Sequence, residues 1–183
     1  MAINRKKLSL KELNRVSLDE YKKTEKLPII IVLDNIRSMS NIGSIFRTSD
    51  AFKVKTIHLC GITSKPPHRE IRKTALGATE SVAWKYFTNT MDSIHELKED
   101  GYQIISIEQV RNSTLLQNYQ PNSSQKIALV VGNEVNGVEQ EVIDESDICL
   151  EIPQYGTKHS LNVSISAGLV IWHVFHANYL LQN

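Results

Sequence analysis

The chain has 183 residues and a formal net charge of +1, with 41% hydrophobic and 22% charged residues. This length suits one domain with a sizeable core, and the composition is that of an ordinary globular protein. No apolar run approaches the roughly 20 residues needed to span a bilayer. The basic residues 1–11 lack the apolar segment of a secretory signal. A near-neutral charge alone favours no class of partner.

The cysteines and histidines indicate neither a disulfide framework nor a metal site. Cys60 and Cys149 each lie at a strand-like apolar stretch, whereas a disulfide framework needs more cysteines in a shorter chain. We therefore expect free thiols in a reducing cytoplasm. His173 and His176 are three residues apart, but no carboxylate or cysteine lies beside them, so ordinary packing explains them better than metal binding.

The first predicted element is a basic amphipathic helix over residues 9–24. Ser9 and Glu12 fit a capping box, and apolar residues follow at roughly helical spacing. Residues 1–26 hold eight Lys and Arg against four Asp and Glu. Pro28 ends this helix, so we expect residues 1–27 to form a basic helical extension.

Strand and helix patterns alternate through the remaining residues, 28–183. The apolar run 29–33 suits a strand that is covered on both faces, as in parallel sheets. Further strands are predicted at 55–60, 82–87, 103–107, 127–131 and 148–152, and helices at 41–52, 69–76, 90–100, 138–144 and 161–181. This alternation predicts one α/β domain with a mainly parallel sheet flanked by helices. The polar stretch 112–125 is predicted to be a loop.

The common nucleotide-binding motifs are missing. A dinucleotide-binding glycine motif would follow the first strand, but residues 34–37 contain no glycine. Gly132 and Gly137 have the spacing of a phosphate-binding loop, yet Val138 and Glu139 stand where Lys and Ser or Thr are required. A dinucleotide or triphosphate site of the usual kind is therefore not expected.

Residues 41–47 predict a helix start with a polar side. Gly43 lies one turn before Arg47, an arrangement that would leave room for a large group to reach the guanidinium. The alternative is a surface pair of Arg47 with Asp50, which would have little energetic value.

A second polar segment, residues 132–137, follows the strand predicted at 127–131. Glycine at the end of a parallel strand lets backbone approach a ligand closely, and ligands collect at the carboxyl ends of such strands. The alternative is a plain turn with an exposed Glu134.

A third polar segment, residues 152–164, contains a Pro/Gly loop that brings Ser160 and Asn162 to the start of the last apolar stretch. Either residue could cap the final helix. Two polar residues plus Ser164 within one turn are more than capping needs.

Together, the three segments resemble the motifs of the SpoU (TrmH-like) branch of the SPOUT RNA methyltransferases. The matching positions are Asn41, Gly43 and Arg47 in the first motif, Gly132, Glu134 and Gly137 in the second, and Ile152, Pro153, Gly156 and Ser160 to Ser164 in the third. Their order and spacing agree, and the resemblance runs from residue 28 to the end. It implies an α/β fold whose C-terminal segment is threaded into a deep trefoil knot.

The resemblance also implies a homodimer, joined through the knot and the last helix. The apolar residues of that helix are compatible with such an interface: Leu169, Ile171, Trp172, Phe175 and Leu180.

The activity that the resemblance implies is methyl transfer from S-adenosylmethionine to a ribose 2′-OH of RNA, with Arg47 as the catalytic residue. A guanidinium with a pKa above about 12 is a poor base, so we expect Arg47 to hold an RNA phosphate and stabilise developing alkoxide charge. Asn41 would orient Arg47 or the ribose. Ser160 and Asn162 would hold the reacting centre, from the same or the partner subunit, and Glu134 would brace the motif loops.

The resemblance places the bent cofactor in the knot, held largely by backbone groups. The expected cofactor-binding residues are Gly132, Glu134, Ile152, Ser160 and Leu161, with Ile107 and Glu108 closing the pocket. No metal is implied. Besides the N-terminal helix, the residues expected to grip RNA are Lys65, Arg69, Arg72, Lys73 and Lys158, although charge clusters can also be plain solvated surface.

Two points stay open from the sequence. The extension before Pro28 is short, and several ribosomal-RNA members of the family carry a separate N-terminal RNA-binding domain, so tRNA is favoured over rRNA. The alternative to an enzyme is a catalytically silent knotted RNA-binding or assembly factor. Retention of Arg47, Asn41, Ser160 and Asn162 together favours the enzyme.

Overall fold

A computed structural model describes residues 6–9, 11–122 and 125–177. Its strands are β1 (Leu27–Asp34), β2 (Val54–Cys60), β3 (Ala83–Phe87), β4 (Gln103–Ile107), β5 (Thr114–Leu115), β6 (Ile127–Val131) and β7 (Ile148–Glu151). They form one sheet in the order β3-β2-β1-β6-β4-β7-β5, and every neighbouring pair is parallel. The predicted parallel sheet is therefore confirmed.

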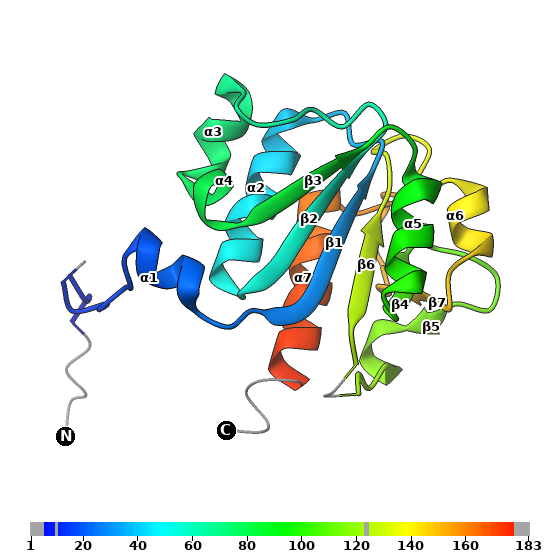
Figure 1. The fold of residues 1–183 in the computed structure, drawn as a ribbon. Helices are drawn as coiled ribbons and strands as arrows, with labels where there is room; N and C mark the ends of the chain where they lie inside the picture. The colour runs from blue at the N-terminus through cyan, green and yellow to red at the C-terminus, as the bar shows by residue number, and fades with distance from the viewer. Residues whose placement is uncertain (1–5, 10, 123–124, 178–183) are drawn as a thin grey trace, which may run out of the picture.

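Helices cover both faces of the sheet (Figure 1). They are α1 (Leu18–Lys23), α2 (Met39–Ala51), α3 (Arg69–Ala75), α4 (Ala78–Ser81), α5 (Thr90–Glu99), α6 (Gln140–Asp144) and α7 (Val163–Phe175), with a 3₁₀ turn at Leu116–Asn118. Helices α2, α3 and α7 contribute side chains to the core on one face, and α5 and α6 to the core on the other.

The central position of strand β1 in the sheet explains why its sequence is a continuous apolar run. Ile29, Ile31 and Leu33 belong to the core beneath α2 and α7, whereas Ile30 and Val32 belong to the core beneath α5 and α6. Successive side chains of a strand point to opposite faces, so a strand in the middle of a sheet covered on both sides must be apolar throughout.

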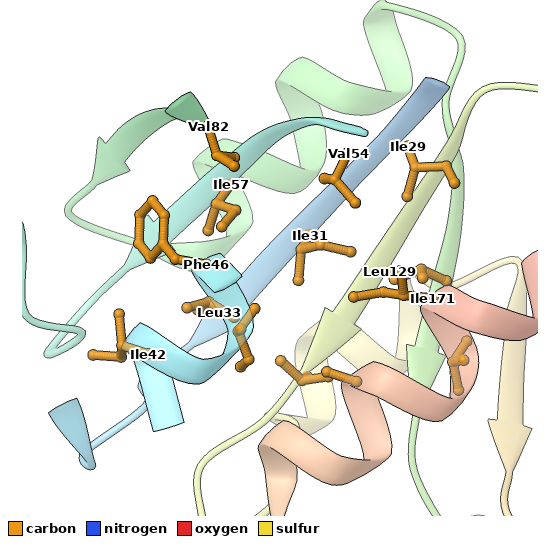
Figure 2. Close-up of a cluster of buried hydrophobic side chains, with 14 of the residues drawn as sticks. Ile29, Ile31, Leu33, Ile42, Phe46, Val54, Ile57, Val82, Leu129 and Ile171 are labelled. Atoms are coloured by element: carbon orange, nitrogen blue, oxygen red, sulfur yellow. The ribbon is translucent and has the colours of Figure 1, made fainter. Parts of the chain in front are cut away.

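Helix α7 packs on the first of these two cores. Figure 2 shows Ile171 of α7 beside Leu129 of β6, with Ile31 of β1 close by. Ile171 is fully buried, so its expected place at a subunit surface is wrong. Its side chain faces the sheet because the helix must bury one apolar stripe there. Leu180 lies outside the described residues.

The N-terminal extension differs from the prediction. Ser9 and Glu12 do exchange the hydrogen bonds of a capping box, but the chain forms only turns there, and Asn14 has a φ of +45°. The helix, α1, begins only at Leu18, after a second capping box made by Ser17 and Glu20. The predicted short helix exists, but over residues 18–23 in place of 9–24.

Three small elements were not predicted, namely the four-residue α4 and, inside the expected loop 112–125, β5 and the 3₁₀ turn. Among the described residues, none of the helices has the length and apolar character needed to cross a membrane. Within the same part of the chain, no group of three or more His, Cys, Asp or Glu side chains is placed to hold a metal ion.

Cys60 is buried, which raises the pKa of its thiol to about 12, and Cys149 is partly buried; both are free thiols.

Candidate active site

A cavity of about 510 Å³ lies at the carboxyl edge of the sheet, where the chain segments that follow β4, β6 and β7 meet. Parallel strands bring these segments to one edge, because all of them leave the sheet at the same end. All seven residues predicted to bind a cofactor line the cavity: Ile107, Glu108, Gly132, Glu134, Ile152, Ser160 and Leu161. Asn162 lines it as well.

Glu134 joins the loop after β6 to the start of α2. Its Oε2 accepts a hydrogen bond from the backbone N–H of Arg37 (2.9 Å), and its Oε1 accepts from the N–H of Ser38 (3.0 Å) and from Nδ2 of Asn41 (2.9 Å). Partial burial by itself would raise the pKa of Glu134, but these donors outweigh it and hold the pKa below its usual value. Glu134 is therefore an ionised anchor at neutral pH.

Asn41 continues this connection to the last helix. Its Oδ1 accepts a hydrogen bond from Nδ2 of Asn162 (3.1 Å), while the Oδ1 of Asn162 accepts from the backbone N–H of Ser164 (2.9 Å) and caps α7. Asn162 is thus the capping residue of the two that the sequence offered. One row of hydrogen bonds, Glu134 to Asn41 to Asn162, ties together the three motif segments.

The glycines of the second motif are required by the protein itself. A Cβ atom at Gly132 would lie 2.1 Å from the backbone of Gly137 and of Val138. Gly137 has a φ of +73°, and a Cβ there would lie 2.2 Å from Oε2 of Glu108, which accepts a hydrogen bond from the N–H of Val138. The space at these glycines is filled by backbone and by Glu108, not kept open for a ligand as the sequence suggested.

The space beside Gly43 is also filled by another part of the protein. A Cβ atom there would lie 2.1 Å from Oγ1 of Thr74 and 2.3 Å from the carbonyl oxygen of Ile71, so α3 packs directly against this glycine. The expectation that Gly43 leaves room for a large group beside Arg47 is therefore wrong. Glycine at this position serves close packing of two helices.

Arg47 lies on the exposed side of α2 and is not among the residues that line the cavity. It is six residues after Asn41, which corresponds to about 9 Å along the helix axis. No ion pair of Arg47 occurs among the described residues, and Asp50 accepts a hydrogen bond from Ser81. The alternative of an Arg47–Asp50 pair therefore does not apply.

The residues expected to grip RNA fall into three places. Arg69 at the start of α3 and Arg72 and Lys73 in its last turn line a second hollow. Nζ of Lys65 lies 4.1 Å from the ring centroid of Tyr86, in a cation–π contact outside that hollow. Lys158 is exposed in the loop between β7 and α7.

The sequence did not predict the polar residues that hold the chain in place at the carboxyl edge of the sheet. Asp34, fully buried at the end of β1, accepts hydrogen bonds from Oγ1 of Thr90 (2.6 Å) and from the N–H of Glu139 (2.9 Å). Asn35 has a φ of +54°, and its carbonyl oxygen accepts from Nδ2 of Asn133 (2.7 Å). The available signal was an Asp-Asn pair directly after a buried strand, since such residues end strands in tight turns.

Gln109 was also missed. Its Nε2 donates to the carbonyl oxygen of His159 (2.8 Å), so the segment after β4 is tied to the loop before α7, and both residues line the cavity. The only sequence signal was its position next to Glu108 at the end of a predicted strand.

Comparison with known proteins identifies the family. The SpoU rRNA Methylase family model matches residues 28–172. The 23S rRNA (guanosine-2'-O-)-methyltransferase RlmB of Neisseria meningitidis serogroup B is 33% identical over 159 residues, which are 86% of this chain and 62% of that protein. The chain spans less than two thirds of the length of the curated relatives that it matches.

Solved structures agree with this result. The TrmH/SpoU tRNA modifying enzyme of A. aeolicus has a TM-score of 0.79 and 25% identity, covering 90% of this chain and 82% of that one. The AdoMet-bound rRNA methyltransferase from Sinorhizobium meliloti has a TM-score of 0.75 and 26% identity, covering 84% and 59%. The resemblance seen in the sequence is confirmed: this chain belongs to the SpoU rRNA methylase family.

Proposed function

We propose that this protein is an S-adenosylmethionine-dependent methyltransferase that acts on a ribose 2′-OH of RNA. The observation that carries the proposal is the row of hydrogen bonds from Glu134 through Asn41 to Asn162, which holds three separate motif segments around one cavity. Family membership supports the reaction class, and the AdoMet-bound methyltransferase of similar fold supports the cofactor.

The cavity fits this cofactor in size and lining. Its volume of about 510 Å³ lies within the range of about 300–1,000 Å³ that is usual for small-molecule sites. Ile107, Leu150 and Ile152 offer apolar contact for an adenine ring, while Glu108 and Gln109 supply polar groups beside them. When bound, S-adenosylmethionine supplies an electrophilic methyl group on a sulfonium.

We assign the chemistry to Arg47, which lies outside that pocket, and to Ser160 and Asn162, which line it. An in-line displacement would need a ribose oxygen within about 3–3.5 Å of the methyl carbon. The oxygen–carbon bond would form as the carbon–sulfur bond breaks, and the hydroxyl proton would pass to solvent water. Arg47 would hold an RNA phosphate and stabilise the negative charge that develops on the oxygen. Ser160 and Asn162 would position the ribose at the mouth of the cavity.

We propose that a homodimer completes the site. Arg47 lies outside the cavity of its own chain, so a second subunit is the simplest source of the guanidinium. An apolar stripe on and before α7 supports this: Leu161, Ile165, Leu169 and Trp172 are each 38–55% exposed. Leu169 and Trp172 from the predicted interface belong to the stripe, Phe175 is half-buried beside it, and Ile171 is excluded.

We further propose the trefoil knot of the SPOUT fold for the C-terminal segment, and residues 28–183 as the catalytic domain with 1–27 as its extension. The family match beginning at residue 28 supports this division. For the substrate we propose tRNA, in the cytoplasm, because the tRNA modifying enzyme is matched over a larger share of its length than the rRNA methyltransferase structure is.

The test compares RNA from cells with and without the protein. Mapping of 2′-O-methyl groups in total RNA should reveal a site that is lost with the gene and restored by the purified protein with S-adenosylmethionine. A lost site in rRNA in place of tRNA would correct the substrate. If the protein binds both S-adenosylmethionine and RNA but restores no methyl group, the silent RNA-binding factor is the better description.

A further inference from the structure

A second hollow, of about 460 Å³, lies apart from the cofactor cavity. It is lined by residues of α3 and of the loop just before it, namely Pro67, His68, Arg69, Arg72 and Lys73. The loop that follows β2 runs from the carboxyl edge of the sheet to this helix, as Figure 1 shows. Four of the five lining residues can carry positive charge, and residues 65–73 contain only one acidic side chain, Glu70.

The cations of the hollow differ in how far they are already neutralised. Nζ of Lys73 pairs with both carboxylate oxygens of Glu70, at 2.8 and 2.9 Å. The guanidinium groups of Arg69 and Arg72 make no ion pair or hydrogen bond with any residue that the structure describes. Both guanidinium groups are therefore available to bind a ligand.

His68 adds a further donor. Its Nδ1 accepts a hydrogen bond from the backbone N–H of Glu70 (3.2 Å). A neutral imidazole that accepts through Nδ1 carries its proton on Nε2, so the other ring nitrogen is a donor. The hollow thus combines two planar cations with an imidazole N–H donor.

Helix α3 packs directly against α2, which carries Asn41 and Arg47. Ile71 and Ala75 are buried, Gly43 of α2 lies directly against the backbone of Ile71, and Oγ1 of Thr74 donates to the carbonyl oxygen of Ser40 (3.0 Å). A ligand held in the hollow would therefore keep a fixed position relative to the proposed catalytic helix.

We propose that this hollow is a phosphate-binding subsite for the RNA backbone, in which Arg69 and Arg72 contact the phosphodiester oxygens. The inference rests on the proposed function and adds where the RNA is held. The planar guanidinium fork matches a phosphate through two parallel hydrogen bonds, which a lysine cannot reproduce.

A polyanion fits this hollow better than a free anion does. All three of its cationic side chains are exposed, and exposed charges bind a single small ion weakly because water and salt screen them. An RNA strand gains affinity from each phosphate contact through release of condensed counterions, so exposed arginines become effective when they act on a polymer.

The test uses the full chain with Arg69 and Arg72 both changed to Ala. The affinity for a tRNA transcript should fall about tenfold at moderate salt, and the slope of log K against log salt should flatten by about 1.4–1.8 because two phosphate contacts are lost. Affinity for S-adenosylmethionine, measured by calorimetry, should stay within about twofold. A double Arg→Lys variant should recover part of the affinity, because it keeps the charge without the fork.

A matched control removes the same charge elsewhere. Lys85 and Lys98 pair with Glu96 and Glu145 on the opposite side of the sheet, so the double change Lys85→Ala and Lys98→Ala should alter RNA affinity less than twofold. If the arginine variant binds RNA as this control does, the proposal is wrong. If inorganic phosphate binds the wild type in a 1:1 ratio and only that binding is lost in the variant, the hollow is a small-anion site and the RNA assignment is overturned.

A failure of the proposed function and a failure of the phosphate subsite would give different results in these assays. RNA binding that depends on Arg69 and Arg72, with no methyl transfer by the wild type, would support the subsite and refute the enzyme. Methyl transfer with an unchanged Michaelis constant for RNA in the variant would support the enzyme and refute the subsite.

Discussion

The carboxylate of Glu134 offers a quantitative test of how the site is held together. Changing Glu134 to Ala removes the acceptor of three hydrogen bonds, from Arg37, Ser38 and Asn41. Bonds to a buried charged group contribute about 1.5–3 kcal/mol each, but Glu134 is exposed to solvent, so about 1 kcal/mol each is the better value. We expect the free energy of unfolding to fall by about 3 kcal/mol, which lowers Tm by about 6–12 °C in a chain of this size.

The stability lost in the Glu134→Ala variant should depend on pH in a defined direction. The pKa of Glu134 is lowered in the folded state, so its contribution is present above the ordinary carboxyl pKa and is lost as the pH falls through the folded-state value. Urea denaturation at pH 7 and at steps toward pH 4 should show the difference between wild type and variant shrinking with acid. Affinity for S-adenosylmethionine should fall as well, because the loop after β6 loses its anchor.

The control for this experiment is Val135→Ala. Val135 is in the same loop, 71% exposed, and should change the free energy of unfolding by less than about 0.5 kcal/mol. Two results would refute the reasoning: a Glu134→Ala variant as stable as this control at pH 7, or a loss of stability that stays constant as the pH is lowered.

Three further predictions concern catalysis, packing and assembly. Arg47→Ala should abolish methyl transfer while calorimetry still detects S-adenosylmethionine binding, and Arg47→Lys should be nearly as poor; substantial turnover in a tritium-transfer assay would remove Arg47 from the mechanism. Gly43→Ala should lower the free energy of unfolding by about 1–3 kcal/mol in a denaturant titration, since its Cβ would lie 2.1 Å from Thr74, and a neutral effect would mean that α2 and α3 can separate freely. Leu169→Asp should shift the protein from dimer to monomer in sedimentation velocity and reduce transfer with it; an unchanged sedimentation coefficient would argue against the stripe as the interface.

The N-terminal segment shows where local sequence signals reach their limit. Two capping boxes occur in the extension, at Ser9–Glu12 and at Ser17–Glu20, and both make their hydrogen bonds. Only the second starts a helix, which also buries Tyr21 and places its hydroxyl on the carbonyl oxygen of Asp50 (2.7 Å). Short helices draw most of their stability from tertiary packing, so a cap without a packed face does not suffice.

The glycines show a second limit. At Gly43 and Gly132 the sequence indicates that a side chain is not wanted, and this is correct. It does not say what fills the space, which proved to be α3 in one case and the loop's own backbone in the other. The filling group comes from a different part of the chain at Gly43, so no local pattern contains it.

The sequence by itself determined the alternation of strands and helices, the parallel sheet and the family, because periodicity and motif spacing are properties of neighbouring residues. Only the tertiary structure decided that Glu134, Asn41 and Asn162 bond to one another across 93 and 121 residues, and that Arg47 lies outside the cavity of its own chain. Those contacts depend on the strand order, which places β6 beside β1, and on how α2 and α7 pack on the sheet. Contacts between residues so far apart in the sequence are fixed by burial and packing of the whole chain, and a local pattern of residues does not encode them.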